Sequence, residues 1–249
     1  MKRFQDKVVV VTGGSSGIGL AAAEQFVAEG AFVYIVGRRQ AELDAAVAAI
    51  GSSVGGVQAD VSNVEDLQRL YRTIGEKHGR VDVVFANAGF VVMGALGELT
   101  EAQYVQQFDA NVKGVLFTVQ LALPLMGPGG TIVLNSSIGA SRAFASSSLY
   151  SASKAAVRSF ARSWTLDLKD RGIRVNAISP GPTVTNVLKA SGFSSDVEQQ
   201  TKEHLASTIP LGRMADAHEV ASGVLFLASN DSSFIAGSEL FVDGGVAQV

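Results

Sequence analysis

The sequence predicts an α/β protein built on a doubly wound sheet of seven mainly parallel strands with helices on both faces. Short runs of β-branched residues alternate with amphipathic helical stretches, which is the pattern of successive right-handed βαβ units. The composition, 47% hydrophobic and 17% charged with 27 glycines, suits buried strands joined by tight turns. No linker, repeat or charge block divides the chain, so we expect a single dinucleotide-binding and catalytic domain over residues 1–249.

The expected elements follow one another in chain order. Strands are predicted where apolar, β-branched runs are short, at residues 7–12, 32–37, 54–59, 81–86, 131–134, 174–179 and 239–242. Helices are predicted where apolar residues recur at helical spacing, at residues 17–29, 40–50, 64–78, 100–125, from about 149 to 171, and 218–228. The stretch from about 185 to 210 breaks this alternation, since it is polar at first and mildly helical later. We expect it to form a loop and helix beside the substrate.

Composition also excludes several classes of function. Without cysteine the chain has no disulfide, thiolate nucleophile or cysteine-bound zinc, and its three histidines are too scattered to predict a metal site. A formal charge of -3 gives no basic surface for nucleic acid or an anionic membrane. The apolar run at residues 8–11 is too short for a signal-peptide core or a membrane span, so a cytoplasmic location is expected.

A glycine-rich turn follows the first expected strand and leads directly into a helix. Its sequence from Thr12 is Thr-Gly-Gly-Ser-Ser-Gly-Ile-Gly, with the spacing G-x-x-x-G-x-G. Glycines allow a sharp turn and a close approach to a pyrophosphate, whose charge the free N–H groups at a helix start stabilise. We therefore expect a dinucleotide at Gly13, Ser15, Ser16, Gly17, Ile18 and Gly19.

Two arginines end the second expected strand, where an acidic residue would bind a free ribose 2′-hydroxyl. Guanidinium groups at Arg38 and Arg39 would instead bind a 2′-phosphate through charge-assisted hydrogen bonds, which favours NADP(H) over NAD(H). The alternative, that these arginines only solvate the start of a surface helix, fits Arg39 better than Arg38.

Tyr150 and Lys154 are four residues apart in an expected helix and would share one face. An ammonium about 4 Å from a phenolate attracts it by roughly 4 kcal/mol at an effective dielectric near 20, which would lower the phenol pKa by roughly three units. A phenol so tuned can exchange a proton near neutral pH. Taken alone, however, this spacing is common on amphipathic helices.

The glycine turn together with Tyr150-x-x-x-Lys154 resembles the short-chain dehydrogenase/reductase family. Further matching positions are Asp60-Val61, Asn87-Ala88-Gly89, Asn111, Ser137 thirteen residues before Tyr150, and Pro180-Gly181. The resemblance covers residues 7–245 and implies a Rossmann-like fold. Arg38 and the ending Phe-Val-Asp-Gly-Gly at 241–245 resemble NADP-dependent bacterial alcohol dehydrogenases of this family that reduce ketones. The chain departs from the family pattern at Ala86, often asparagine, and at Ser16, which is basic in some NADP-preferring members.

The resemblance implies a role for each matching residue. Tyr150 would be the general acid, Lys154 would tune it and bind the nicotinamide ribose, and Ser137 would hydrogen-bond the substrate oxygen. Asn111 would mark a helix irregularity that holds a water leading to Lys154. Further cofactor contacts are implied at Asp60, Val61, Asn87, Ala88, Gly89, Pro180, Gly181, Thr183 and Thr185.

Apolar residues flanking these positions predict the substrate wall: Phe90, Ile138, Phe144, Leu149 and Phe193, beside Ser137 and Tyr150. The leading expectation is an NADP-dependent oxidoreductase acting on hydrophobic ketones and secondary alcohols. One alternative is a 3-oxoacyl-carrier-protein reductase with the same catalytic groups, which Arg142 keeps open. Another is a sensor that binds NADP without catalysis. The family resemblance also implies a homotetramer built partly on the helix after Tyr150.

Overall fold

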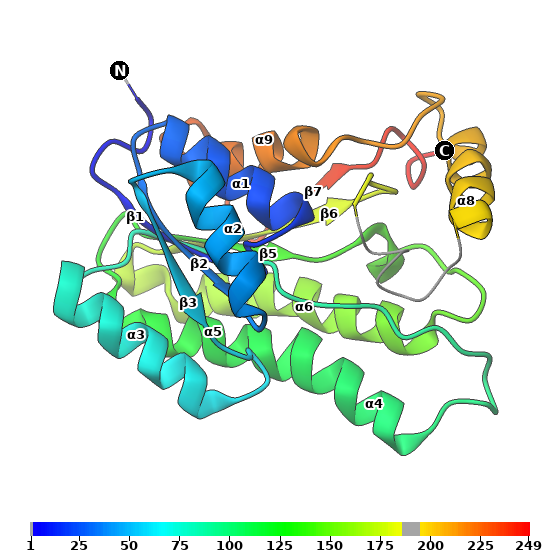
Figure 1. Cartoon of the computed structure of the whole chain (residues 1–249), viewed down its shortest axis with the longest axis horizontal. Coiled ribbons are helices and arrows are strands. Elements are labelled where there is room, and N and C mark those ends of the chain that lie inside the picture. The colour runs from blue at the N-terminus through cyan, green and yellow to red at the C-terminus, as the bar shows by residue number, and fades with distance from the viewer. Residues whose placement is uncertain (1, 186–194) are drawn as a thin grey trace.

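The computed structural model describes residues 2–185 and 195–249 (Figure 1). Its seven strands form one sheet in the order β3-β2-β1-β4-β5-β6-β7, and every neighbouring pair is parallel. The strands are β1 (Val8–Thr12), β2 (Phe32–Gly37), β3 (Val54–Gln58), β4 (Val83–Ala86), β5 (Thr131–Asn135), β6 (Arg174–Pro180) and β7 (Glu239–Val242). The predicted fold class is thereby confirmed, and the sheet is parallel throughout.

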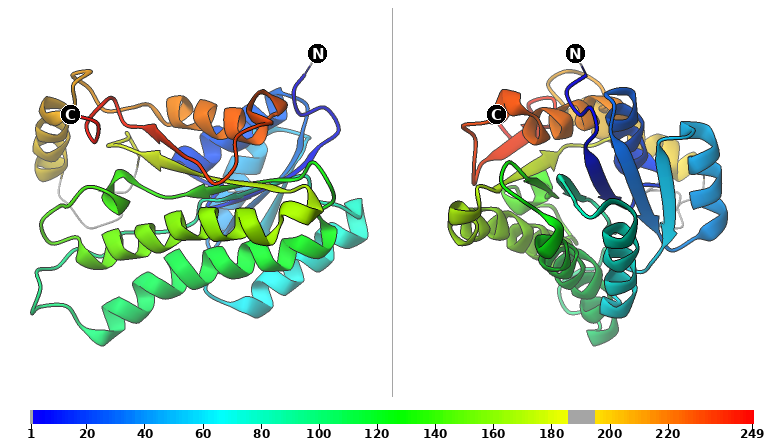
Figure 2. Two further views of the ribbon diagram at one scale, coloured as in Figure 1. Left: turned by 180° about the vertical axis from the view of Figure 1, so that it is seen from behind. Right: turned by 90° about the vertical axis from the view of Figure 1, so that its left-hand side faces the viewer.

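Helices cover both faces of the sheet (Figures 1 and 2). One face packs against α1 (Gly17–Ala28), α2 (Gln40–Ile50) and α9 (Ala217–Ala228), and the other against α3 (Val64–His78), α5 (Gly114–Ala122) and α6 (Ser148–Asp167). Strand β1 shows why helices are needed on both faces. Val9 and Val11 belong to the core under α1, α2 and α9, and Val8 and Val10 belong to the core under α3, α5 and α6. Because successive side chains of a strand alternate between faces, an unbroken valine run is stable only with apolar layers on both sides.

The helix predicted at residues 100–125 is present but interrupted, with the irregularity expected at Asn111. It consists of α4 (Glu101–Phe108), one π-helical turn η1 (Asp109–Lys113), α5, and a 3-10 turn η2 (Leu123–Leu125). Thr100 starts α4 with a capping box in which its hydroxyl accepts from the N–H of Gln103. The π turn inserts an extra residue at Asn111, and Pro124 lies in the 3-10 turn that ends the segment.

The predicted helix at about 149–171 corresponds to α6, which is followed by the 3-10 turn η4 (Lys169–Arg171). Two further 3-10 turns are η3 (Ile138–Ala140) after β5 and η5 (Asn230–Ser232) after α9. Helix α8 (Ser195–Thr208) lies within the stretch expected beside the substrate, at one end of the molecule (Figure 1). Within the described ranges, no helix combines the length and hydropathy that crossing a bilayer requires.

The strand order reverses between β1 and β4, since the chain proceeds outward from β1 to β3 and then from β4 to β7 in the other direction. Ligands of open parallel sheets bind outside the carboxyl ends of the strands at such a switch point. The expected site residues mostly follow strand ends, so the topology brings them to this one edge.

Candidate active site

The glycine turn connects β1 to α1 and packs against Asn87 and Ala88, which follow β4. Gly13 and Gly17 have positive φ angles of 66° and 54°. A Cβ at Gly19 would lie 2.2 Å from the carbonyl oxygen of Gly13 and 2.6 Å from Nδ2 of Asn87, which leaves room for glycine alone. Ser16 precedes α1 as N-cap without a side-chain cap bond in the described part of the chain. The first N–H groups of α1 therefore lie beside a tight, glycine-lined turn, with Ser15 and Ile18 partly buried on either side.

Asn87 and Ala88 are fixed to this turn by Thr12. The backbone N–H groups of both residues donate to Oγ1 of Thr12 at 3.0 Å. The side-chain Nδ2 of Asn87 donates to the carbonyl oxygens of Thr12 at 2.9 Å and Gly13 at 3.3 Å, and its Oδ1 accepts from Asn135 at 2.8 Å. Three strand ends, β1, β4 and β5, are thus connected through side-chain amides and one hydroxyl.

The two arginines after β2 differ in their partners. Arg39 forms an ion pair with Glu42 in the first turn of α2. The side chain of Arg38 is 67% exposed, and its guanidinium lies 4.0 Å from the carboxylate of Asp60, at the outer limit of an ion pair. Of the two, Arg38 is therefore the better placed to bind a phosphate, which agrees with the sequence-based preference for Arg38.

Asp60 and Val61 follow β3 on the same edge. One carboxylate oxygen of Asp60 accepts from the N–H of Ser62 at 2.9 Å and from its hydroxyl at 2.7 Å. The N-cap of α3 is Asn63 rather than Asp60, because the Asn63 side chain accepts from the N–H of Glu65. Val61 packs against Gly114, where a Cβ would come within 2.9 Å of it.

The expected residues after β6 lie against the glycine turn and the end of the chain. A Cβ at Gly17 would lie 3.1 Å from Cγ2 of Thr185, so Thr185 reaches the start of α1. Gly181, which follows Pro180, donates its N–H to the carbonyl of Val242 at 2.9 Å. The hydroxyl of Thr183 donates to the carbonyl of Gly181 at 2.9 Å.

Tyr150, Lys154 and Ser137 come together between β5 and α6. The Nζ of Lys154 lies 5.8 Å from the centroid of the Tyr150 ring and donates to the carbonyl oxygen of Asn135 at 2.7 Å. Ser137 is 8% exposed, and its Oγ accepts from the N–H of Gly139 at 3.1 Å. A phenol, an ammonium and a hydroxyl therefore share a largely buried corner of the sheet edge.

Burial controls the protonation of this corner. It raises the pKa of Tyr150, and an interaction with the Ser137 hydroxyl opposes that rise. It lowers the pKa of Lys154 from its ordinary value of 10.5 to about 8. Both shifts favour the neutral form of each group. The expectation that Lys154 alone brings the Tyr150 pKa near neutrality is therefore wrong, because burial raises that pKa.

Asn111 lies in the π turn η1 and is completely buried. Its Nδ2 donates to the carbonyl of Phe90 at 3.0 Å and to Oγ of Ser153 at 3.1 Å, while its Oδ1 accepts from the N–H of Phe90 at 3.1 Å. A Cβ at Gly89 would lie 2.9 Å from Oδ1 of Asn111 and 3.7 Å from Nζ of Lys154. The irregularity expected at Asn111 is thus present. Gly89, which has no side chain, lies between the amide of Asn111 and the ammonium of Lys154.

The residues expected to line the substrate side are placed unequally. Phe144 is 43% exposed, and Phe90 and Leu149 are partly buried. Ile138 is 5% exposed and packs with Ile209 and Val246, so it supports this region from within. A cavity of about 280 Å³ lies beside α6, lined by Gly94, Leu96, Ala143, Phe144, Ser146, Ser147, Ser148 and Ser151. Phe193 lies outside the described residues.

Three residues of this region were not expected from the sequence. They are Thr12, whose hydroxyl accepts two backbone N–H groups, Asn135, whose carbonyl binds Lys154, and the buried Gln107 of α4. Thr12 and Asn135 are the last residues of their strands, and a polar residue at such a position is itself a signal. Gln107 precedes Asn111 by four residues, which places both amides on one helix face.

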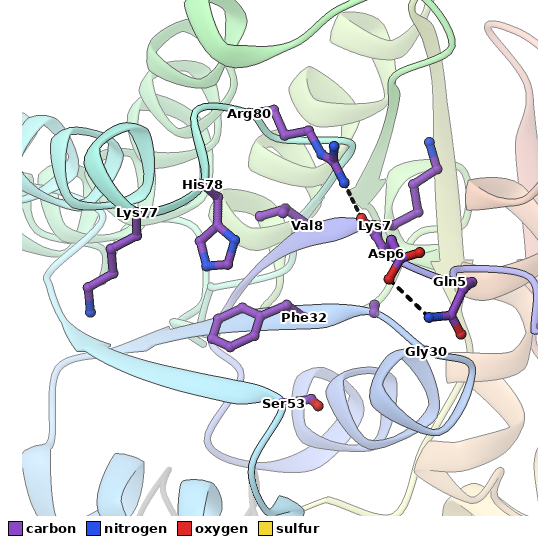
Figure 3. Close-up of a pocket in the computed structure, with 11 residues that line it drawn as sticks. Gln5, Asp6, Lys7, Val8, Gly30, Phe32, Ser53, Lys77, His78 and Arg80 are labelled. Carbon is purple, nitrogen blue, oxygen red and sulfur yellow. Dashed lines mark hydrogen bonds between the residues drawn. The ribbon is translucent and has the colours of Figure 1, made fainter.

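A second crevice lies at the opposite, amino edge of the sheet (Figure 3). It has a volume of about 540 Å³ and is lined by residues from the starts of β1 and β2, including Lys7 and Phe32, and by His78 and Arg80. Its groups are largely bound to each other: Arg80 donates to the carbonyl of Asp6, Lys7 and Arg80 pair with Asp82, and the His78 ring packs on Phe32 at 4.7 Å. We therefore place the candidate active site at the carboxyl edge.

Comparison with known proteins agrees with this fold and shows the family. The family described as "Enoyl-(Acyl carrier protein) reductase" matches residues 13–247. The chain is 45% identical over 251 residues to oxidoreductase asL5 of Sarocladium schorii, covering 100% of this chain and 99% of that protein. It is 36% identical over 251 residues to the NADP-dependent (R)-specific alcohol dehydrogenase of Lentilactobacillus kefiri, covering 98% of this chain and 97% of that protein.

Among solved structures, that of levodione reductase superposes with a TM-score of 0.94 at 30% identity, covering 98% of this chain and 99% of that one. The fold and these relatives define an oxidoreductase. The chain belongs to the short-chain dehydrogenase/reductase family.

Proposed function

We propose that this oxidoreductase transfers a hydride between NADPH and a hydrophobic ketone, and in reverse from the secondary alcohol. The observation that carries the proposal is the meeting of Tyr150, Lys154 and Ser137 beside the glycine turn. Its likeness to an NADP-dependent alcohol dehydrogenase of Lentilactobacillus kefiri supports the same reaction.

The residues fit a nicotinamide dinucleotide. The glycines of the turn at Gly13–Gly19 carry no side chains, which would leave its backbone N–H groups open to a pyrophosphate, and Gly19 packs directly on the Gly13 carbonyl. Arg38 would bind the 2′-phosphate, with Arg39 as an auxiliary, and Asp60 would accept from the adenine amino group. Thr185, which lies against Gly17, would meet the carboxamide. When bound, the cofactor supplies or accepts the hydride.

The chain's own side chains handle the proton. In the reduction, the phenol of Tyr150 donates its proton to the ketone oxygen as the carbonyl carbon is reduced. The hydroxyl of Ser137 donates a hydrogen bond to the same oxygen, where negative charge develops. The ammonium of Lys154 stabilises the phenolate that remains, since opposite charges attract strongly in a buried site. The amide of Asn111 holds the chain at Phe90 beside this ammonium, from which a water-mediated path to solvent would restore the proton.

The proposed substrate is a ketone with an apolar substituent. The 280 Å³ cavity beside Ser151 is lined by Leu96, Ala143 and Phe144 together with serine residues. Sites for small molecules are commonly about 300–1,000 Å³, so this cavity suits a single aryl or short alkyl group. The largely apolar surface favours that group over a charged one.

The test is a spectrophotometric assay of purified protein with NADPH, NADH and a panel of aryl and alkyl ketones. We expect loss of the reduced-cofactor absorbance with NADPH and at least one ketone, and a rate lower by several orders of magnitude in Tyr150→Phe. Fluorescence titration should show that the variant still binds NADPH. Equal turnover by the native chain and Tyr150→Phe would falsify the role of this phenol.

A 3-oxoacyl thioester is the second candidate substrate, because the matching family description names an acyl carrier protein. Arg142 precedes Ala143, which lines the 280 Å³ cavity; it donates to the carbonyl of Val246 and its guanidinium carbon lies 5.9 Å from the centroid of the Phe144 ring. A thioester of 3-oxobutanoate in the same assay discriminates between the two. A higher kcat/KM for the thioester than for every simple ketone would favour this candidate.

We also propose a homotetramer built partly on α6. That helix carries a stacked pair, Phe160 and Trp164, with ring centroids 4.5 Å apart, and Leu166 is 70% exposed. Light scattering coupled to size-exclusion chromatography measures the mass directly, and a monomer would overturn the proposal. The cytoplasmic location stays a prediction that cell fractionation would check.

A further inference from the structure

One buried amide in the site has no part in the proposed proton transfer. Gln107 of α4 is 0% exposed. Its Nε2 donates to the carbonyl oxygen of Phe90 at 2.8 Å, and its Oε1 accepts from the backbone N–H of Val92 at 2.7 Å. Asn111, four residues further on, binds the N–H and carbonyl of Phe90 at 3.1 Å and 3.0 Å. The two side-chain amides therefore hydrogen-bond the backbone of residues 90 and 92, as a neighbouring strand would, and both donate to the Phe90 carbonyl.

Residues 90–92 connect the cofactor side of the site with the substrate side. Before them, the N–H groups of Asn87 and Ala88 are bound to Thr12. After them, the N–H of Gly94 donates to the carbonyl of Ser146 at 2.8 Å, and both of these residues line the 280 Å³ cavity. The hydrogen bonds from Gln107 and Asn111 hold residues 90–92, the middle of this connecting segment, between its two anchored ends.

We propose that Gln107 is a positioning residue that decides which ketone substituents the site accepts, because it fixes the wall formed by residues 90–92. This inference rests on the proposed ketone reduction and deepens it. Packing alone does not require glutamine here, since methionine fills nearly the same volume without a buried amide to satisfy. What glutamine adds is a donor for the Phe90 carbonyl and an acceptor for the Val92 N–H.

The first test compares Gln107→Met with Gln106→Met, since Gln106 is the exposed neighbour on the same helix. Gln107→Met removes both hydrogen bonds of this side chain, so we expect the KM for an aryl ketone such as acetophenone to rise about tenfold, within the range for one or two lost buried hydrogen bonds. The KM for butanone, kcat and the NADPH dissociation constant should change little, because a small ketone does not need the ordered wall. Gln106→Met should match the native chain. Equal changes for both ketones, or none, would overturn the specificity role.

Gln107→Glu supplies a readout that packing alone would not move. A protonated glutamic acid can donate to the Phe90 carbonyl, whereas the carboxylate repels it. The KM for acetophenone relative to that of the native chain should therefore fall as the pH is lowered. Asp109 and Lys113, which pair at 2.7 Å on the next turn, and Tyr150 and Lys154 on α6 are the same in both proteins, so their effects cancel in this ratio. A ratio independent of pH would count against the hydrogen bond as the cause.

Amide hydrogen exchange separates this inference from the reaction it rests on. The N–H of Val92 should exchange faster in Gln107→Met than in the native chain or in Gln106→Met. If the native chain reduces no ketone, the proposed function fails, but the exchange rate of the Val92 N–H still reports whether Gln107 holds residues 90–92 in place. Unchanged exchange at Val92 together with unchanged ketone selectivity would refute the positioning role.

Discussion

The buried ammonium of Lys154 should destabilise the free protein in a way that depends on pH. Lys154 is 5% exposed, and burial lowers its pKa from 10.5 to about 8. Between these values the unfolded chain binds a proton that the folded chain has lost. Because stability rises with pH wherever the unfolded state holds more protons, the native chain should gain stability as the pH rises through this window. The full penalty is present below the folded-state pKa.

The size of the effect follows from that shift. At about 1.4 kcal/mol per pKa unit, the charged lysine costs the fold roughly 3 kcal/mol near neutral pH. Replacing Lys154 by methionine removes the charge and keeps the length of the side chain. The stability of the native chain relative to Lys154→Met should therefore rise by roughly 2.5 kcal/mol between about pH 7 and about pH 10. The hydrogen bond to the Asn135 carbonyl is lost in the variant at every pH and offsets part of its gain.

Urea unfolding of both proteins at these two pH values measures the change. Lys77→Met is the matched control, since Lys77 is an exposed lysine at the end of α3 and should show no comparable pH dependence. Other titrating groups are common to the proteins compared and cancel in the difference. A stability difference that stays constant with pH, or that moves in the opposite direction, would show that Lys154 is not a desolvated ammonium.

Three further predictions address the cofactor site and the direction of reaction. Gly19→Ala would place a Cβ 2.2 Å from the Gly13 carbonyl and should abolish measurable NADPH binding in a fluorescence titration, whereas Gly127→Ala, with open space around it, should bind normally. Arg38→Ala should raise the KM for NADPH by about tenfold or more and leave NADH nearly unaffected, while Arg39→Ala, whose native side chain pairs with Glu42, should have the smaller effect; equal effects on both cofactors would exclude 2′-phosphate binding. Because burial raises the pKa of Tyr150, alcohol oxidation should accelerate as the pH rises above neutrality while ketone reduction does not, and parallel pH profiles of the two directions would contradict this.

Local sequence patterns were sufficient for the sheet and for the glycine turn. The valine run of β1 is buried on both faces, and hydrophobicity alone is enough to predict such a strand. Gly13 to Gly19 were predicted because a turn with positive φ and close backbone contact admits little but glycine. These features depend on short stretches of chain, so their physical cause is visible in the sequence.

The interruption of the predicted helix at 100–125 and the amide pair depend instead on distant parts of the chain. The π turn at Asp109–Lys113 occurs where Asn111 binds Phe90 and Ser153, which belong to other elements. Gln107 looks in the sequence like any polar helix residue, and its burial follows from the course of residues 90–92. Helical periodicity describes one segment at a time, whereas these hydrogen bonds connect three segments: residues 90–92, the α4–η1 segment and α6.

The spacing of Tyr150 and Lys154 predicts neighbours, but their charges depend on what surrounds them. An ammonium close to the phenol oxygen would lower the phenol pKa strongly, yet in this site Nζ of Lys154 donates to the carbonyl of Asn135, and burial is the largest influence on the pKa of Tyr150. Burial then favours the neutral phenol. A phenol that keeps its proton is ready to donate it, which suits the proposed reduction. Oxidation needs the phenolate, so it should depend more strongly on Lys154 and on pH, and Lys154→Met should impair oxidation more than reduction when both are measured at the same pH.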